Sequence, residues 1–336
     1  MSNKTKLHKI YNLTIKIAVV IVAFHFIYRR LFVKENFIDT FISFENKFRE
    51  SSFIKLYILV LLLMVINWSL ETIKWKYLIR KIENVSFLKA LVAVLSGITV
   101  SIFTPNRIGE YAGRVFILEK ADRWEGALIT MLGSISQLLV TTIAGSVGFI
   151  FFAYEYIDLQ NNPQYYLYGL IMLVVILITV LLLFFFNVSV LTVFINKLPG
   201  KLKKLRSYGR IFSIYTKKEL LNVILISTFR YMVFITQFYL LLKLFGVKIP
   251  YYEAMVLISL IYLVMAAIPT IALTELGIRC SVALYFIGLY FTTNNAAAQN
   301  DIAVLSSTTM LWIINLVIPA MIGAIFVFRL KFFRKD

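Results

Sequence analysis

Residues 104–114 read TPNRIGEYAGR and follow directly on an apolar run. Residues 268–279 read IPTIALTELGIR and end a second apolar run with similar chemistry. Each stretch combines a proline with a glutamate and, four positions after that glutamate, an arginine. Proline removes a backbone donor and clashes with the preceding helical turn. We therefore predict that one helix breaks at Pro105 and another at Pro269.

The composition sets the class of protein around these two breaks. The chain has 336 residues, of which 60% are hydrophobic, and its formal net charge is +18. Soluble domains are nearer half apolar, and several runs here approach or exceed the roughly 20 apolar residues that a membrane-spanning helix needs. The sequence therefore predicts an all-α polytopic membrane protein. Its basic residues cluster between apolar segments, as cytoplasmic anchors do, and this clustering argues against nucleic-acid binding.

The apolar runs predict about six full spans and two shorter helical pairs. The shorter runs, 87–103 and 252–268, have only about 17 residues each. Each ends at a proline break and is followed by a returning segment, 109–118 or 275–291. Irregular backbone at membrane depth survives only where protein or a wet cavity satisfies it, so we interpret each pair as a re-entrant hairpin. The full spans are predicted at 10–28, 53–74, 126–154, 166–186, 219–245 and 302–328.

The order of these segments predicts an inverted repeat. Pro105 follows Phe53 by 52 positions, and Pro269 follows Glu219 by 50. A single transmembrane domain, residues 1–336, would then consist of two halves, 10–154 and 155–330, of opposite topology. Alternating-access transporters are built in this way. The basic flanks place both termini in the cytoplasm and the protein in the cell (inner, cytoplasmic) membrane by the positive-inside rule.

We expect the two breaks to meet near the bilayer midplane and to form the substrate site. The N-terminus of a returning helix carries free N–H groups and a partial positive charge, and arginine offers a fork that matches phosphate oxygens. Arg230 lies about eleven residues into its span, so it should contact either substrate or a structural carboxylate such as Glu275. The candidate substrate-binding residues are Pro105, Arg107, Gly109, Glu110, Arg114, Arg230, Pro269, Glu275, Gly277 and Arg279.

Other polar residues receive simpler interpretations. Glu71 and Asn67 lie one turn apart near the predicted end of the 53–74 span, and we interpret them as interfacial. Gln137 is the one large polar residue of the 126–154 span. Two histidines and one cysteine form no cluster in the sequence, so we expect no metal site. We also expect no cofactor and no catalytic residue.

These residues resemble the two signature loops of the lysylphosphatidylglycerol synthase transmembrane family, the flippase-like module of the multiple peptide resistance factor proteins. The resemblance covers about residues 10–330. It is carried by TPNRIGE at 104–110 followed by Arg114, and by the IP and ELGIR segments of 268–279. It implies that Arg107, Glu110 and Arg114 belong to the first site loop. Glu275 and Arg279 would belong to the second.

The sequence departs from this family in two places. Many members are glycine-rich after the second proline, whereas residues 270–274 contain no glycine, so the backbone and substrate are expected to differ there. The chain ends at Asp336 without the soluble synthase domain, so no tRNA-dependent aminoacyl transfer is expected.

The predicted function is that of a flippase rather than an enzyme. It would move a phospholipid or related polar lipid between leaflets, and its partner lipids would be anionic or aminoacylated phospholipids or polyprenyl-linked lipids. A membrane transferase for lipid-linked glycosyl or acyl groups is the first alternative. A non-catalytic subunit of an envelope assembly is the second. The head group, direction, energy source, synthase partner and oligomeric state, a homo-oligomer included, stay open.

Overall fold

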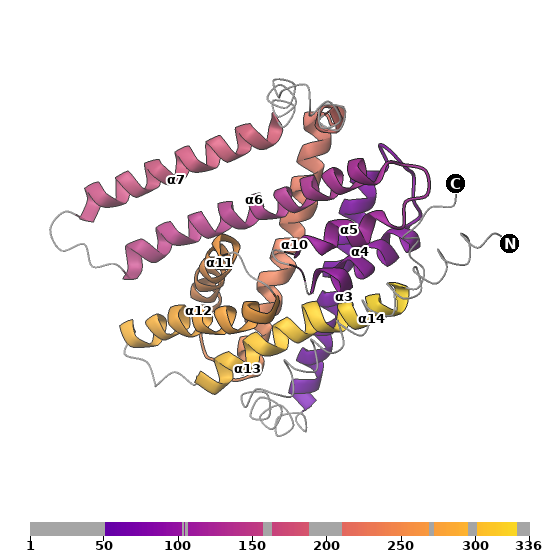
Figure 1. The fold of residues 1–336 in the computed structure, drawn as a ribbon. Coiled ribbons are helices and arrows are strands. Elements are labelled where there is room, and N and C mark those ends of the chain that lie inside the picture. The colour runs from indigo at the N-terminus through magenta and orange to yellow at the C-terminus, as the bar shows by residue number, and fades with distance from the viewer. Residues whose placement is uncertain are drawn as a thin grey trace.

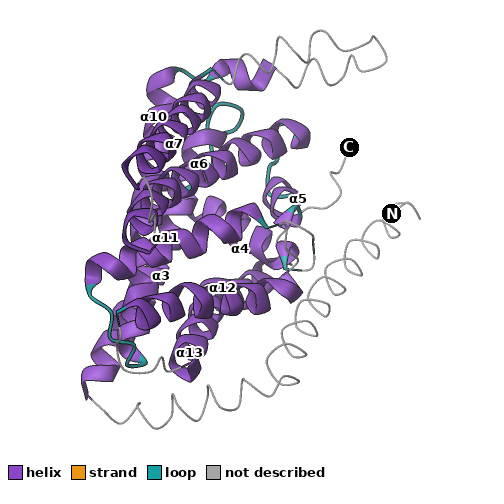
Figure 2. Ribbon diagram, turned by 90° about the vertical axis from the view of Figure 1, so that its left-hand side faces the viewer, coloured by secondary structure: helices purple, strands orange, loops and turns teal. Residues whose placement is uncertain are grey.

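The computed structural model describes residues 51–102, 104, 107–156, 163–187, 210–268, 272–294 and 301–327. Every regular element in this part of the chain is a helix (Figures 1 and 2), which confirms the all-α polytopic class. The predicted 10–28 span, the terminal charges and both break prolines, Pro105 and Pro269, lie outside the described residues.

The helices follow the predicted apolar runs, with shifted ends. The clearest shift is at the first described helix, which continues to Ile79 instead of ending near position 74. The helices in chain order are α3 Ser51–Ile79, α4 Phe87–Ser101, α5 Gly109–Val115, α6 Arg123–Tyr156, α7 Pro163–Phe186, η3 Arg210–Ile214, α10 Lys217–Leu244, α11 Tyr251–Ala267, α12 Ala272–Thr293, α13 Asp301–Trp312, η4 Ile313–Val317 and α14 Ile318–Val327.

Six helical stretches of the described residues are long and apolar enough to cross a membrane. Five of them overlap predicted spans. The sixth, Glu275–Thr293 in α12, overlaps the segment that we predicted as the returning half of a hairpin. α12 has 22 residues, about the length that a full crossing needs. By contrast, α4 and α11 have 15 and 17 residues, in line with the two short runs of the sequence.

Local sequence explains where two of these helices begin. Ser86 caps α4, because its hydroxyl accepts the N–H of Lys89 at 3.3 Å. Thr216 and Glu219 form a reciprocal capping box at the start of α10, which satisfies two backbone donors that the helix itself cannot. α10 ends just before Gly246, whose φ of 88° suits glycine far better than any other residue.

The packing of the helices repeats itself across the molecule. α3 packs along α10, α6 packs against α11, and α14 packs against α4. α7 lies alongside α6 at the outside of the bundle (Figure 1). The two short helices α4 and α11 therefore each pack against a helix that is distant in the sequence, α14 and α6 respectively.

Glycines let these helices approach closely. A Cβ on Gly148 of α6 would lie 2.0 Å from the Ser259 hydroxyl of α11, and a Cβ on Gly323 of α14 would lie 2.1 Å from the Leu95 carbonyl of α4. Small residues at helix interfaces are the usual way in which membrane helices gain van der Waals contact. The α4–α14 contact is also bonded, because the Thr99 hydroxyl donates to the Ala320 carbonyl at 2.7 Å.

Candidate functional site

The two predicted breaks meet through a shared carboxylate. Arg107 donates to both oxygens of Glu275, from Nη2 at 2.8 and 2.9 Å. Arg279, one turn further along α12, donates to Glu275 Oε1 at 2.8 Å. The Glu275 side chain is only 6% exposed, whereas that of Arg107 is 40% exposed. One acid from the second stretch therefore holds an arginine from each stretch.

Arg107 has an unusual backbone. Its φ is 58°, in the left-handed region that residues other than glycine rarely adopt. Thr104 organises the turn on both sides of it: the Thr104 carbonyl accepts the N–H of Arg107 at 3.3 Å, and the Thr104 hydroxyl accepts the N–H of Gly109 at 2.8 Å. Arg107 thus precedes α5, and its backbone is bonded to Thr104.

Gly109 has a packing role in the structure. A Cβ there would lie 2.4 Å from the Val100 carbonyl, and one on Gly113 would lie 2.5 Å from the Cα of Gly97. α5 therefore lies backbone to backbone against α4. In α12, the Gly277 carbonyl accepts the Ser281 hydroxyl at 3.0 Å. Neither of the predicted site glycines, Gly109 or Gly277, lines the cavity described below.

A second charged cluster centres on Glu71, whose side chain is 6% exposed. Its two oxygens receive Arg114 Nη1 at 2.9 Å, Lys74 Nζ at 2.9 Å and Arg230 Nη1 at 3.0 Å. Arg114 also pairs with Glu110. Because α3 runs on to Ile79, Glu71 lies inside the helix bundle and not at an interface, so the interfacial interpretation was wrong. Arg230 does pair with a carboxylate, but the partner is Glu71 and not Glu275.

Amide side chains extend this cluster across the bundle. Arg230 Nε donates to Asn67 Oδ1 at 2.9 Å, and Asn67 Nδ2 donates to Asn315 Oδ1 at 3.2 Å. Asn315 in turn donates to Gln237 at 3.1 Å. Arg230 Nη1 reaches Gln137 Oε1 at 3.3 Å. These bonds leave the buried amides satisfied, which is what an apolar surrounding requires.

A cavity of about 520 Å³ opens beside these residues. Among the described residues its wall contains three guanidiniums, those of Arg107, Arg230 and Arg279, against the single carboxylate of Glu275. The lining alone therefore carries an excess of two positive charges, and Glu71, which lies outside the wall and pairs with Arg230, offsets one of them. Of the predicted residues, Glu110 and Arg114 lie outside this wall. The other lining residues are Gln137, Leu138, Thr141, Tyr231, Phe234, Tyr262, Met265, Ala266, Ala267 and Ile268.

Two tyrosines in this wall have hydroxyls without a partner among the described residues. Tyr231 and Tyr262 are 7% and 8% exposed, and their hydroxyl oxygens make no hydrogen bond there. The Nε of Arg279 is also buried and has no hydrogen-bond partner in that part of the chain. The Arg279 guanidinium lies 5.8 Å from the centre of the Tyr262 ring. Unmet donors beside a cavity are groups that a polar ligand can satisfy.

The fold and this site define a polytopic helical membrane protein with a cavity whose wall includes four charged residues. The chain belongs to the family described as the lysylphosphatidylglycerol synthase TM region, whose model matches residues 13–298. The match confirms the resemblance of the two loops and gives the protein a role connected with membrane lipids. Searches of curated proteins and of solved structures each found no match.

Proposed function

We propose that this protein moves a lipid with an anionic, phosphate-bearing head group between membrane leaflets, and that the head group passes through the cavity beside Glu275. The observation that carries the proposal is the charge of the wall, three guanidiniums against one carboxylate. A buried excess of positive charge is costly unless an anion offsets it. The acyl chains would stay in the bilayer.

The bonding of Arg107 and Arg279 supports a specific way of receiving this head group. Without substrate, Glu275 accepts a hydrogen bond from Nη2 of each of the two guanidiniums. A phosphate offers the same pair of oxygens and fits the same planar fork. A phosphate would therefore replace Glu275 as the partner of Arg107. Arg107 is the most exposed side chain of the group formed by Arg107, Glu275 and Arg279. The hydroxyls of Tyr231 and Tyr262, which also line the cavity, would donate further hydrogen bonds to the head group.

The reciprocal packing of the helices supports an inverted repeat with halves 10–154 and 155–330. α4 packs against α14 and α11 packs against α6, while α3 packs against α10. A pseudo-two-fold axis that exchanges the halves would exchange the first two contacts and retain the third. Transporters with such repeats bind substrate between them. We propose the two short pairs, α4–α5 and α11–α12, as the equivalent broken segments on either side of this site.

The pairing of the carboxylates favours transport over catalysis. A general acid or base must have a proton to exchange with the reacting group. Glu275 accepts from two guanidiniums, and Glu71 is paired with three cations. Both are thus held ionised as structural partners. We therefore propose a non-enzymatic module in the cell membrane, with the most basic loops on the cytoplasmic side.

Reconstituted liposomes with labelled phosphatidylglycerol test this function. Purified protein should make inner-leaflet label accessible to an external, impermeant quencher. Arg107→Gln should slow this exchange by about tenfold, since a hydrogen bond to a charged group contributes about 1.5–3 kcal/mol. Lys120→Gln removes an equal charge from the exposed turn after α5 and should leave the rate unchanged. Equal rates for the wild type and Arg107→Gln would refute the proposal, provided that both elute as folded protein.

A further inference from the structure

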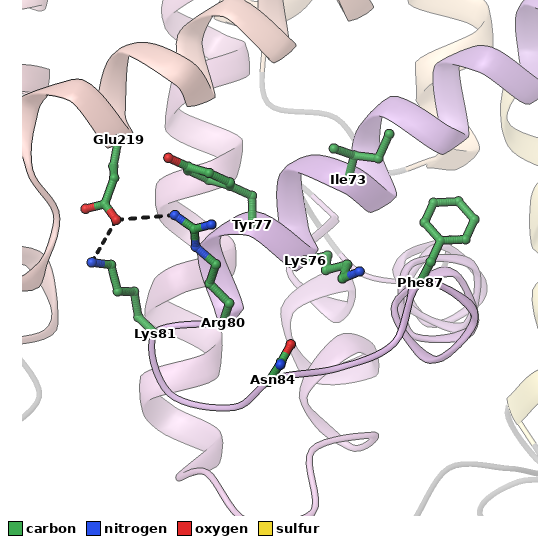
Figure 3. A pocket seen from close by; sticks show the side chains of 8 residues that line it. All are labelled: Ile73, Lys76, Tyr77, Arg80, Lys81, Asn84, Phe87 and Glu219. Carbon is green, nitrogen blue, oxygen red and sulfur yellow. Dashed lines mark hydrogen bonds and ion pairs between the residues drawn. The ribbon is translucent and has the colours of Figure 1, made fainter.

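A second pocket, of about 670 Å³, lies beside the C-terminal end of α3 (Figure 3). It forms where the last turns of α3, the loop through Asn84, the start of α4 and the start of α10 meet. It shares no lining residue with the cavity beside Glu275. Its lining residues are Ile73, Lys76, Tyr77, Arg80, Lys81, Asn84, Phe87 and Glu219.

The pocket is basic, and its single carboxylate is already occupied. Three of the lining side chains are cationic, against one acid, Glu219. Glu219 Oε1 binds Lys81 at 2.7 Å and Arg80 at 3.5 Å. Its other oxygen accepts the Thr216 N–H at 2.9 Å as part of the α10 capping box. Because this carboxylate also caps a helix, it cannot turn freely to neutralise a third cation.

Lys76 is that third cation. Within the described residues its ammonium makes no ion pair or hydrogen bond, in contrast to Lys81 on the other side of the pocket. In Figure 3, Glu219 lies at one side with Arg80 and Lys81, Phe87 lies at the other, and Lys76 lies between. The Arg80 guanidinium stacks 4.0 Å from the centre of the Tyr77 ring. The pocket thus offers two cations one helical turn apart at the end of α3: Lys76, which has no ion pair among the described residues, and Arg80, which is only weakly paired with Glu219.

An apolar stripe leads away from this basic pocket along α3. Ile73, in the pocket wall, is 45% exposed, and Ile66, seven positions earlier, is 46% exposed. Leu62 and Leu59 continue the same face at 55% and 43%, since residues spaced by three, four and seven positions share one side of a helix. Phe87, at the far wall, is 37% exposed. A basic pocket at the end of an exposed apolar stripe matches the charged head group and apolar chain of an anionic phospholipid.

We propose that this pocket binds the head group of an anionic glycerophospholipid, with an acyl chain along Ile73, Ile66 and Leu62. Lys76 and Arg80 hold the phosphate. We infer a lipid and not a free phosphate ion, because inorganic phosphate has no acyl chain to contact the apolar stripe. The site is separate from the transport cavity, and it would tie the α3–α4 turn and the start of α10 to one leaflet. Basic pockets between transmembrane helices are suited to such head groups.

Native mass spectrometry of the purified full chain, with phosphatidylglycerol and phosphatidylcholine as probes, tests this site. The wild type should retain a bound phosphatidylglycerol that Lys76→Gln/Arg80→Gln loses, with affinity lower by about tenfold or more for two basic residues. The matched control, Lys89→Gln/Lys120→Gln, removes two exposed charges near the same turn and should retain the lipid. Arg107→Gln should retain it as well, which separates this site from the transport cavity.

Three results would overturn the proposal. The first is equal retention by the wild type and the Lys76→Gln/Arg80→Gln variant. The second is equal loss in both double variants, which would indicate diffuse charge attraction. The third is full displacement of phosphatidylglycerol by millimolar inorganic phosphate, which would make the stripe irrelevant. If the double variant fails to fold, Lys76→Gln alone replaces it, because this change breaks no ion pair among the described residues.

Discussion

Glu71 is the carboxylate on which three buried cations converge. Lys74 and Arg114 are 1% and 3% exposed, and Arg230 is 15% exposed. Removing water from four charges is costly, and only their mutual attraction and hydrogen bonds offset that cost. The burial of these four charges is therefore favourable only while all of them are present. Each of the three cations is stabilised by its ion pair with Glu71.

Replacing Glu71 by glutamine should destabilise the protein more than any surface change of charge. The variant leaves three buried cations without their shared anion, so the expected loss is about 3 kcal/mol or more. Thermal unfolding in detergent measures it. Glu119→Gln provides the control, because it removes the same charge from a side chain that is 46% exposed. Similar melting temperatures for both variants would contradict the central role of Glu71.

Arg107 combines a guanidinium that binds Glu275 with a left-handed backbone conformation, and mutation can separate these two properties. Arg107→Asn and Arg107→Val both remove the guanidinium from Glu275. Asparagine tolerates the left-handed φ of 58°, whereas for a β-branched residue that conformation is a genuine outlier. The valine variant should therefore unfold with about 1 kcal/mol less stability than the asparagine variant, while both lose transport. Identical melting curves would show that the turn relaxes and that its geometry carries no cost.

At the scale of elements, glycine contacts decide how closely α14 approaches α4 and how closely α6 approaches α11. Gly323→Ala would place a methyl group 2.1 Å from the Leu95 carbonyl, which is backbone and cannot swing aside. Gly148→Ala would meet the Ser259 hydroxyl at 2.0 Å. Overpacking of this kind costs about 1–3 kcal/mol. The Gly323 variant should be the worse of the two, since a serine hydroxyl can rotate.

Gly169 in α7 is the matched control for these substitutions. A Cβ there has nothing within 4 Å, and alanine favours a helix more than glycine does. Gly169→Ala should therefore melt at the wild-type temperature or above. If all three alanine variants melt together, the close α4–α14 and α6–α11 contacts do not limit stability.

At the scale of the whole molecule, the proposed inverted repeat makes a prediction about sidedness. In a Cys280→Ala background, Lys120→Cys should react with an impermeant thiol reagent only after cells are permeabilised. Thr293→Cys, at the end of α12, should react in intact cells. Both positions are exposed, so accessibility within the protein is not limiting. Reaction of both from the same side would rule out the opposed halves.

The general fold could be predicted because apolar length and proline position are local properties of a sequence. Paired acids and bases in apolar stretches were informative for a similar reason, since burial of charge requires a partner. The pairing of Arg107 with Glu275 therefore agrees with the expectation that the two stretches meet at one site. The length of α12 did not follow, because residues 275–291 read equally well as half a hairpin or as a span.

Other site residues could not be predicted for physical reasons. Glu71 is followed by the basic residues Lys74, Lys76 and Arg80, and that run mimics a membrane interface. Only the tertiary position of α3 shows that Glu71 faces α5 and α10. Tyr231 and Tyr262 are two of 19 tyrosines, and nothing local distinguishes a tyrosine beside a cavity from one at the lipid boundary.

The wide turn η4, Ile313–Val317, lies just before Pro319, and there the Ile318 N–H bonds back to the Ile313 carbonyl. One extra residue interrupts the α-helical repeat, so α13 and α14 are two helical segments joined at a π-bulge. Asn315 lies in this π-bulge and forms hydrogen bonds with Asn67 and Gln237. Gly323 and Ala320 of α14 contact α4 directly. We therefore expect that a change of angle at η4 would move α14 and α4 together, although the two helices lie more than 200 positions apart in the sequence.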